Sequence, residues 1–343
     1  MRFLVWGAGA IGGTLGAFLA RAGHDVTLVD TVAEHVAAVN RSGLTISGPI
    51  AAFTTPLPAF TPDTLHGGGA WDTIILATKA HHTEMAVRAL LPHLTPAGCV
   101  ISAQNGLNEL AIAAVAREAR TVGAFVNFGA DYLEPGSILY GGRGTVMVGE
   151  AFGDPSQRVT PRVLAIRDAW RDFDDRTAAT PNIWGYLWAK EAYGAMLFAT
   201  ALTDDSIADG LARREYRPLY IALAREILAV TLARGVHPEA FDGFDPAAYL
   251  PAAPAGAAEQ SLDQLVAHNR KSAKTHSGIW RDLAVRKRPT EVDAQLGIVA
   301  ALGAEAGVPT PLTSAVVRLI HEIERGERRQ SMEALDALAG VMT

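Results

Sequence analysis

The sequence has a single cysteine among its 343 residues, Cys99. One cysteine excludes an intramolecular disulfide, and its place in an apolar run predicts a buried strand residue. This cysteine usage is typical of a protein from a reducing compartment, so we expect a cytoplasmic location.

The chain also lacks a basic excess and a long apolar run. It has 30 Lys and Arg against 36 Asp and Glu, a net charge of −6, and no basic stripe with interleaved aromatic residues. We therefore expect no nucleic-acid partner. No apolar run is long enough to span a bilayer, and no basic leader precedes the first strand, so we expect no signal peptide and no membrane partner. The adjacent His81 and His82 have poor metal-ligand spacing, and we expect no metal.

The clearest motif is a glycine pattern near the N-terminus, which reads Gly7-Ala-Gly9-Ala-Ile-Gly12. An apolar strand precedes it and a helical stretch follows, as in a dinucleotide-binding site. Gly7 permits a tight turn, Gly9 lets the backbone approach a pyrophosphate, and Gly12 lets the helix pack closely on the strand. Ala10 and Ile11 begin the helix, whose N-terminal N–H groups attract phosphate.

The second predicted strand ends on Asp30, about 20 residues beyond the glycines, where a carboxylate accepts hydrogen bonds from ribose hydroxyls. The same carboxylate would repel the 2′-phosphate of NADP, and no Arg follows it closely. We therefore expect NAD as the cofactor, with NADP as the alternative. A second reading of Asp30 is that it caps the next helix.

The first half of the chain alternates predicted strands and helices, which is typical of a parallel sheet covered on both faces. Residues 43–62 predict a short antiparallel insertion, and residues 137–140 and 145–149 predict a hairpin across a glycine-rich link. From about residue 184 the pattern is helical. We expect an α/β fold with a Rossmann-type dinucleotide-binding domain over 1–180 and an all-helical substrate-binding and catalytic domain over 181–343. Helices are expected at 184–201, 217–234, 261–267, 292–306, 313–325 and 331–339.

Two further segments follow predicted strands at the edge of the sheet where the glycine turn lies. Lys79 follows residues 73–77 and could contact a cofactor ribose or a ketone oxygen, or be a solvated loop lysine. Asn105 follows residues 99–102 and could bind a carboxamide or ribose, cap the next helix, or do both.

The second half offers a lysine within an otherwise apolar helix. Lys190 shares a face with Gly194, Leu197 and Ala201 by helical spacing. A lysine there is costly to bury unless it meets a ligand or a carboxylate, and burial would make it a usable proton donor. The alternative is a lysine that extends from the helix edge to solvent. Glu291 begins a later helix, where it could compensate the helix dipole or pair with Lys190 or a substrate hydroxyl.

Together these features resemble the ketopantoate reductase (2-dehydropantoate 2-reductase) family over essentially the whole chain. The markers, in the family's order, are Gly7-Ala-Gly9-Ala-Ile-Gly12, Thr78-Lys79-Ala80, Gln104-Asn105-Gly106, Trp188-Ala-Lys190 and Arg288-Pro-Thr290-Glu291-Val-Asp293. The resemblance implies that Lys190 is the general acid toward the carbonyl oxygen and that Glu291 hydrogen-bonds the hydroxyl formed. It also implies that Lys79 and Asn105 hold the ribose and nicotinamide side of the cofactor.

The chain departs from the family where substrate is bound. Gly194 and Phe198 stand where the family has asparagines, and Gly278, with Ser277 beside it, stands where the family has a carboxylate-binding serine. Gly194 and Phe198 predict a roomier, more apolar wall without those hydrogen bonds. We expect Ser277 and then His276 to contact a carboxylate, with Lys274 and Arg281 as further candidates. The alternative for this basic stretch is a solvated helix face.

The sequence therefore predicts an NAD(P)-dependent oxidoreductase that interconverts a ketone or 2-keto acid with its alcohol, with an altered substrate pocket. One alternative is a true 2-dehydropantoate 2-reductase that uses NADPH in pantothenate biosynthesis. Another is a non-enzymatic NAD(H)-sensing regulatory protein, against which the Lys190 and Glu291 pair argues. The apolar helices of the second domain also leave a homodimer open, although such stripes more often face a core.

Overall fold

The computed structural model describes residues 1–66, 71–154, 156, 158–271 and 275–342. The chain divides into two compact units, Met1–Ile183 and Trp184–Thr343. Each unit is described by itself below. Within the described residues, no helix combines the length and the apolar character needed to cross a membrane.

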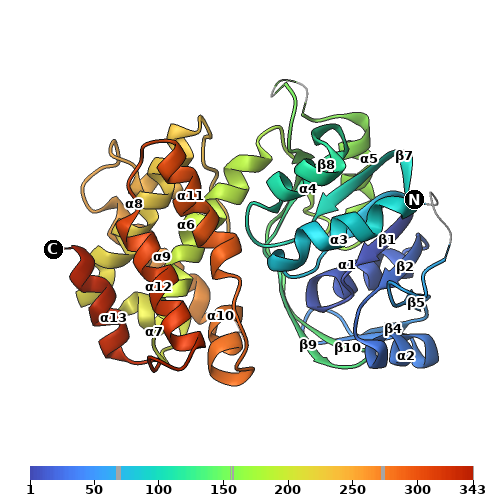
Figure 1. Ribbon diagram of the computed structural model, residues 1–343, viewed down its shortest axis with the longest axis horizontal. Coiled ribbons are helices and arrows are strands. Elements are labelled where there is room, and N and C mark those ends of the chain that lie inside the picture. The colour runs from blue at the N-terminus through green and yellow to red at the C-terminus, as the bar shows by residue number, and fades with distance from the viewer. Residues whose placement is uncertain (67–70, 155, 157, 272–274, 343) are drawn as a thin grey trace. The chain divides into compact units, whose positions relative to one another are not determined.

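The first unit is built on an eight-stranded sheet with the order β12-β11-β8-β7-β6-β1-β2-β5 (Figure 1). Its strands are β1 (Arg2–Trp6), β2 (Asp25–Val29), β5 (Ala59–Phe60), β6 (Trp71–Leu76), β7 (Leu94–Ser102), β8 (Thr121–Val126), β11 (Val146–Glu150) and β12 (Ala178–Ala179). All neighbouring strands are parallel except β8 and β11. The central strands are apolar because both of their faces are covered. Cys99 is buried in β7, as expected, and burial raises the pKa of its thiol to about 11.

Helices cover both faces of this sheet. They are α1 (Ala10–Arg21), α2 (Ala33–Ser42), α3 (Thr83–Leu90), α4 (Asn108–Ala116) and α5 (Pro161–Trp170), with 3₁₀ turns η1 (Ala80–His82), η2 (Leu91–His93) and η3 (Glu118–Arg120). Alternate residues of β1 enter two different cores. Phe3 and Val5 join the core that includes α1 and α5, whereas Leu4 and Trp6 join the core that includes α3 and α4. The predicted doubly covered parallel sheet is confirmed.

A second, four-stranded sheet has the order β4-β3-β10-β9. Its strands are β3 (Leu44–Ser47), β4 (Phe53–Thr55), β9 (Gly129–Glu134) and β10 (Ser137–Gly142). The antiparallel pair β3 and β4 confirms the insertion predicted over residues 43–62. The end of that segment, β5, instead extends the large sheet beside β2.

The predicted hairpin between residues 137–140 and 145–149 is wrong. β10 pairs with β9 and β3 in the small sheet, whereas β11 pairs antiparallel with β8 in the large one. The link between the two strands packs closely against the backbone of Asn127. A Cβ on Gly144 would lie only 2.2 Å from the carbonyl oxygen of Asn127, so this position requires glycine. The N–H of Asn127 also donates to the carbonyl of Thr145 at 3.0 Å. A glycine-rich link between two short strands is compatible with a hairpin and also with two strands that lie in different sheets. The tertiary packing of each strand, which the link itself does not determine, selects the second arrangement.

The second unit is helical. Its helices are α6 (Ile183–Thr200), α7 (Ile207–Ala212), α8 (Arg217–Ala233), α9 (Ala257–Arg270), α10 (Gly278–Trp280), α11 (Ile298–Glu305), α12 (Pro311–Glu324) and α13 (Met332–Ala339), with 3₁₀ turns η5 (Arg214–Tyr216), η6 (Pro246–Tyr249) and η9 (Gly340–Met342). Two π-helical turns, η7 (Arg281–Val285) and η8 (Asp293–Gly297), follow α10 and precede α11. The six predicted helices are confirmed, although 292–306 divides into η8 and α11. The sequence analysis missed α7, α10 and η7, which are too short to show a clear apolar period.

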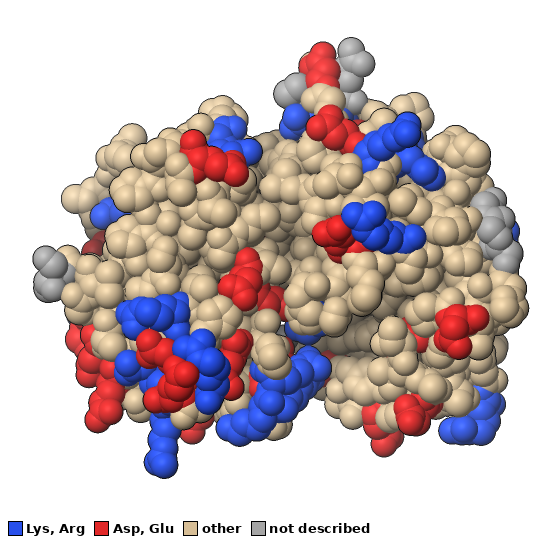
Figure 2. All heavy atoms as spheres, viewed as in Figure 1, with Lys and Arg blue, Asp and Glu red and all other residues tan. Residues whose placement is uncertain are grey.

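Acidic and basic side chains are interspersed on the face shown in Figure 2. In the second unit several acidic and basic side chains form local ion pairs, for example Arg328 with Glu322 at 2.7 Å and Arg325 with Glu327 at 2.7 Å. Exposed pairs of this kind contribute about 0–1 kcal/mol each, so they shape the surface more than they stabilise the fold.

Candidate cofactor and catalytic residues

The glycine turn between β1 and α1 has the geometry that its three glycines predict. Gly7 has φ of +98°, and a Cβ there would lie 2.8 Å from the backbone of Ala77. A Cβ on Gly12 would lie 2.0 Å from the carbonyl oxygen of Gly7, so only glycine lets α1 approach this closely. In contrast, a Cβ on Gly9 would meet nothing within 4 Å. The turn is therefore closely packed at Gly7 and Gly12 and open at Gly9, which fits close approach of a pyrophosphate at that position.

The N-terminus of α1 is open as well. Gly9 is its N-cap residue, and no side chain caps the helix. The first N–H groups of a helix have no partner within the helix, so Ala10 and Ile11 begin a segment suited to an anion. The first turn of α1 holds no acidic residue that would oppose one.

Asp30 lies beside the same turn. One carboxylate oxygen accepts a hydrogen bond from the N–H of Ala8 at 2.8 Å, and the other accepts one from Val32 at 3.0 Å. The sequence analysis gave Asp30 a ribose-binding role or a role as the cap of the next helix. The capping alternative is wrong, because Val32 is the N-cap residue of α2 and no side chain caps that helix, whereas ribose binding stays a prediction. A carboxylate has about four acceptor positions, so two bonds leave room for ribose hydroxyls.

His35 on α2 was missed by the sequence analysis. Its Nε2 lies 3.0 Å from the carbonyl oxygen of Ala8, and its Nδ1 accepts the N–H of Gly136 at 3.0 Å. The side chain is 1% exposed, and burial lowers its pKa despite the nearby charge of Asp30 and the bond to Ala8. His35 and Ala8 lie 27 residues apart and belong to no recognisable sequence motif, so the sequence alone did not predict their contact.

Lys79 and Asn105 follow the carboxyl ends of β6 and β7, which are neighbouring parallel strands. β6 also pairs with β1, so both residues lie on the edge of the sheet that carries the glycine turn. Lys79 is partly buried and precedes η1, and the side chain of Asn105 is exposed. Asn105 does not cap α4: Leu107 is the N-cap residue and no side chain caps the helix.

The two loops are joined by a buried neighbour that the sequence analysis left without a role. Gln104 donates from Nε2 to the carbonyl oxygen of Thr78 and to Oγ1 of Thr83, each at 2.9 Å. These bonds hold the loop after β7 against the loop after β6. Gln104 thereby positions the backbone around both Lys79 and Asn105.

In the second unit, Lys190 lies on α6 among apolar residues and is partly buried, as are Gly194 and Leu197 on the same face. Phe198 lies outside this partly exposed line and is completely buried. The partly exposed face of α6 therefore runs through Lys190, Gly194 and Leu197, and Phe198 belongs to the packed interior.

Glu291 and Gln295 lie one helical turn apart at the start of the η8 segment, where the N–H of Gln295 donates to the carbonyl of Glu291 at 3.0 Å. Each is 8% exposed. A Cβ on Gly194 would lie 3.9 Å from Oε1 of Gln295, so this amide lies beside the glycine. Within the described residues, the side chain of Gln295 makes no hydrogen bond. Sequence analysis missed it because it lies beyond the family marker that ends at Asp293.

The predicted carboxylate-binding residues have local partners. Oγ of Ser277 accepts the N–H of Trp280 at 3.1 Å and caps α10. The ring of His276 lies 4.0 Å from that of Trp280, centroid to centroid, and its Nδ1 lies 2.9 Å from Oγ1 of Thr275. Arg281 begins η7, and Lys274 lies outside the described residues.

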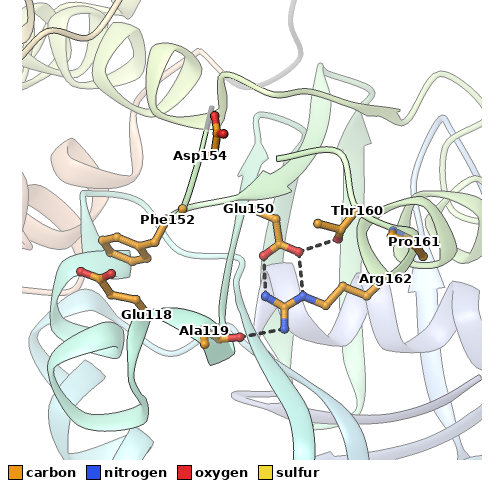
Figure 3. A pocket seen from close by; sticks show the side chains of 9 residues that line it. Glu118, Ala119, Glu150, Phe152, Asp154, Thr160, Pro161 and Arg162 are labelled. Carbon is orange, nitrogen blue, oxygen red and sulfur yellow. Dashed lines mark hydrogen bonds and ion pairs between the residues drawn. The ribbon is translucent and has the colours of Figure 1, made fainter. Parts of the chain in front are cut away.

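A pocket of about 610 Å³ lies elsewhere in the first unit (Figure 3). It is lined by Glu118, Ala119, Glu150, Phe152, Gly153, Asp154, Thr160, Pro161 and Arg162. Glu150 accepts two hydrogen bonds from Arg162 and one from Thr160, and Arg162 also donates to the carbonyl of Ala119. Arg162 is thus already paired with Glu150, and the carboxylates of Glu118 and Asp154 in the lining would repel a phosphate or carboxylate. The pocket does not fit a dinucleotide.

The open glycine turn, the uncapped helix and the carboxylate after β2 define a dinucleotide-binding protein with a second, helical unit. Two family models match this architecture: "Ketopantoate reductase PanE/ApbA" over residues 3–153 and "Ketopantoate reductase PanE/ApbA C terminal" over residues 182–324. The chain belongs to the ketopantoate reductase family.

Individual relatives support this assignment. The chain is 33% identical to a 2-dehydropantoate 2-reductase of Pyrococcus horikoshii over 196 residues, which cover 55% of this chain and 60% of that protein. It is 26% identical to a 2-dehydropantoate 2-reductase of Mesorhizobium japonicum, covering 95% of this chain and 99% of that protein. A solved structure of D-mandelate dehydrogenase with NADH and anilino(oxo)acetate has a TM-score of 0.80 at 20% identity, covering 95% and 99% of the two chains. A likeness at that identity establishes the fold.

Proposed function

We propose that this chain is an oxidoreductase that uses a nicotinamide cofactor, with NAD preferred, to interconvert a 2-keto acid or ketone and its alcohol. One observation in the second unit carries the proposal. Lys190 lies one turn before Gly194 on α6, and Gln295, one turn after Glu291, lies beside that glycine. An ammonium group as acid and one carboxyl group are therefore presented with an open position and an amide, which suits a small carbonyl compound.

The first unit would hold the cofactor. The turn at Gly9 and the first N–H groups of α1 would bind the pyrophosphate, and Asp30 would accept ribose hydroxyls. Lys79 and Asn105 would contact the ribose and nicotinamide side. The open position at Gly9 supports this assignment, because the residues around it leave space where a bound dinucleotide needs it. When bound, the nicotinamide supplies or accepts the hydride at the carbonyl carbon.

The second unit would move the proton. Lys190 would donate it to the carbonyl oxygen during reduction and take it back during oxidation, and Glu291 would hydrogen-bond the hydroxyl group. Reduction should therefore fall as the pH rises through the working pKa of this lysine. The helix around Lys190 is apolar, which reduces competition from water for the same proton.

The residues beside Lys190 favour a substrate with a large apolar or aromatic substituent. Gly194 leaves space next to the lysine, Leu197 continues the same face, and Gln295 supplies one amide. The D-mandelate dehydrogenase neighbour supports this choice, because anilino(oxo)acetate combines an aromatic ring with an oxo carboxylate. Ser277, followed by His276, remains the proposed contact for the carboxylate. Phe198 would act indirectly, because it is completely buried and lies outside the partly exposed face of α6 that carries Lys190.

A steady-state assay tests the proposal. We expect NADH-linked reduction of aromatic and branched 2-keto acids to exceed NADPH-linked reduction of 2-dehydropantoate. Efficient NADPH-linked reduction of 2-dehydropantoate would instead establish the reductase named for several relatives and would contradict our assignment for Asp30 and Gly194. Tight NADH binding without turnover on the whole panel would favour a sensor of NAD(H).

A cytoplasmic location and a homodimer stay predictions. Sedimentation of the purified chain would decide the second, because a dimer has about twice the mass of the 36.2 kDa monomer.

A further inference from the structure

Both backbone polar groups of one residue in the glycine turn, Ala8, are held by side chains from outside the turn. The N–H of Ala8 donates to Asp30 at 2.8 Å, and the carbonyl oxygen of Ala8 lies 3.0 Å from Nε2 of His35. Ala8 lies between Gly7, which has the positive φ, and Gly9, whose side is open. Asp30 therefore holds the Gly7–Ala8 peptide and His35 holds the Ala8–Gly9 peptide, in a place where strand and helix hydrogen bonds do neither.

The hydrogen bonds of His35 also fix its chemical form. The N–H of Gly136 is a donor, so Nδ1 must accept and carries no proton. In the neutral imidazole the proton then lies on Nε2, which donates to the carbonyl of Ala8. A protonated ring would place a second N–H against that of Gly136 and lose this bond.

The far side of His35 is anchored in the small sheet. Gly136 lies in the turn between β9 and β10, with φ of +80°, and its carbonyl accepts the N–H of Thr45 at 2.9 Å. The ring of Tyr132 lies 5.2 Å from that of His35. His35 is thus held by a rigid turn on one side and holds the glycine turn on the other.

We propose that His35, in its neutral Nε2–H form, is a positioning residue that fixes the Ala8–Gly9 peptide and thereby sets the affinity of the glycine turn for the dinucleotide. This inference rests on the proposed function, because it assumes that the turn binds a dinucleotide. It also assigns the small sheet a role in cofactor binding, since the turn at Gly136 orients the histidine.

Two substitutions separate the two bonds of His35. The amide nitrogen of Gln reaches about as far as Nε2, so His35→Gln keeps a donor for the Ala8 carbonyl and loses the acceptor for Gly136. The amide oxygen of Asn reaches about as far as Nδ1, so His35→Asn keeps the acceptor and loses the donor. Both variants lose imidazole packing, so comparing one with the other cancels that shared cost.

The experiment measures NADH dissociation constants by fluorescence, with the melting temperature of each variant as the measure of folding. Wild-type binding comes first: a chain that binds neither NADH nor NADPH would overturn the proposed function and this inference with it. Given binding, we expect His35→Asn to weaken NADH roughly tenfold and His35→Gln to weaken it less than about threefold, the size of one lost hydrogen bond. Equal losses in both variants, no loss in either, or the reverse order would overturn the inference.

The dependence of NADH affinity on pH is a further measurement, and it should not change if His35 only fills space in the core. Asp30 is the charge that acts on His35, and the ring of Tyr132 lies 5.2 Å away; Tyr132 is in turn influenced by Asp30, Glu34 on α2 and Glu134 on β9. Burial lowers the pKa of His35 from its ordinary value, so the folded chain resists a proton that the unfolded chain accepts. NADH affinity of the wild type should fall as the pH drops through this lowered pKa, and this component should be absent from both variants. His24→Gln, which removes a ring bonded to Asp172, is the control and should leave affinity and profile unchanged.

Discussion

In the first unit most of the proposed ligand-binding groups are backbone amides, whereas in the second unit they are side chains on two helical segments. The glycine turn and the start of α1 need small residues at fixed spacing, and the fold supplies the rest. Lys190, Glu291 and Gln295 need their own chemistry, and packing places Gln295 beside Gly194, one turn after Lys190. We therefore expect the first kind of site to depend on backbone geometry and the second on the identity of each side chain.

The largest effect should come from removing the acid of the second unit. We expect Lys190→Ala to lower the turnover number about 10²–10⁴-fold, because general acid catalysis contributes that much. NADH affinity should stay unchanged, since the proposed cofactor contacts lie in the first unit. Turnover and NADH titration of the purified variant measure both. Lys271→Ala, at an exposed position of the same unit, is the matched control, and near wild-type turnover in Lys190→Ala would reject the assignment.

Two glycine substitutions separate packing from binding in the first unit. Gly12→Val should destabilise the fold by roughly 3 kcal/mol or more, because its Cβ would lie 2.0 Å from a backbone oxygen. Gly9→Val should leave the melting temperature nearly unchanged, because its Cβ has open space, and should weaken NADH by about tenfold or more, or 1.4 kcal/mol. Thermal unfolding and NADH titration of both variants test the contrast. Wild-type affinity in a folded Gly9→Val would show that the dinucleotide does not approach there.

A substitution of Asp30 tests whether one side chain can change the cofactor preference of the first unit, where most of the proposed ligand-binding groups are backbone amides. Asp30→Asn removes the charge that disfavours a 2′-phosphate, so the preference for NADH over NADPH should narrow by roughly 30-fold, about 2 kcal/mol, the size of a charged hydrogen bond. Stability should also fall, since both carboxylate oxygens accept backbone N–H groups. Dissociation constants for both cofactors decide the matter. Asp25→Asn, at the exposed start of β2, is the control, and an unchanged preference in Asp30→Asn would contradict the NAD assignment.

The smallest effect concerns Ser277. Ser277→Ala removes the cap of α10 and should cost about 1 kcal/mol of stability. Ser206→Ala removes the equivalent cap of α7 and should cost the same, which makes it a matched control. If the hydroxyl of Ser277 also contacts the substrate carboxylate, KM for a 2-keto acid should rise roughly fivefold in Ser277→Ala alone. Equal KM values in the two variants would leave Ser277 with its capping role.

The sequence predicted the parts of this molecule that depend on local patterns. At Gly7 and Gly12 a Cβ would clash with the backbone, and at Gly9 the turn is open, so the spacing of the three glycines identified the turn and its strand–helix context. The apolar period of α6 and α8 likewise located both helices. By contrast, the partners of β10 and β11 depend on which face each strand buries, and no local pattern contains that information.

Side-chain partners across long sequence separations were the least predictable features. His35 meets Gly136, which lies 101 residues further along the chain, and Gln295 lies beside Gly194 on another helix. Helical spacing placed Leu197 and Ala201 on the face of Lys190, and the resemblance placed Phe198 with the substrate, whereas burial of Phe198 sets it beneath that face. Such contacts follow from tertiary packing, which a single sequence does not encode at fixed spacing.

The link after β10 connects the small sheet to the large sheet, and this connectivity influences the order in which the first unit folds. The β9–β10 hairpin lies within the chain segment that the pairing of β8 with β11 closes. Hairpins form in microseconds, and closing a loop costs less entropy when an inner hairpin has already shortened it. The small sheet's hairpin should therefore form before β11 joins the large sheet, and substitutions that weaken its turn at Gly136 should slow folding of the large sheet they do not touch.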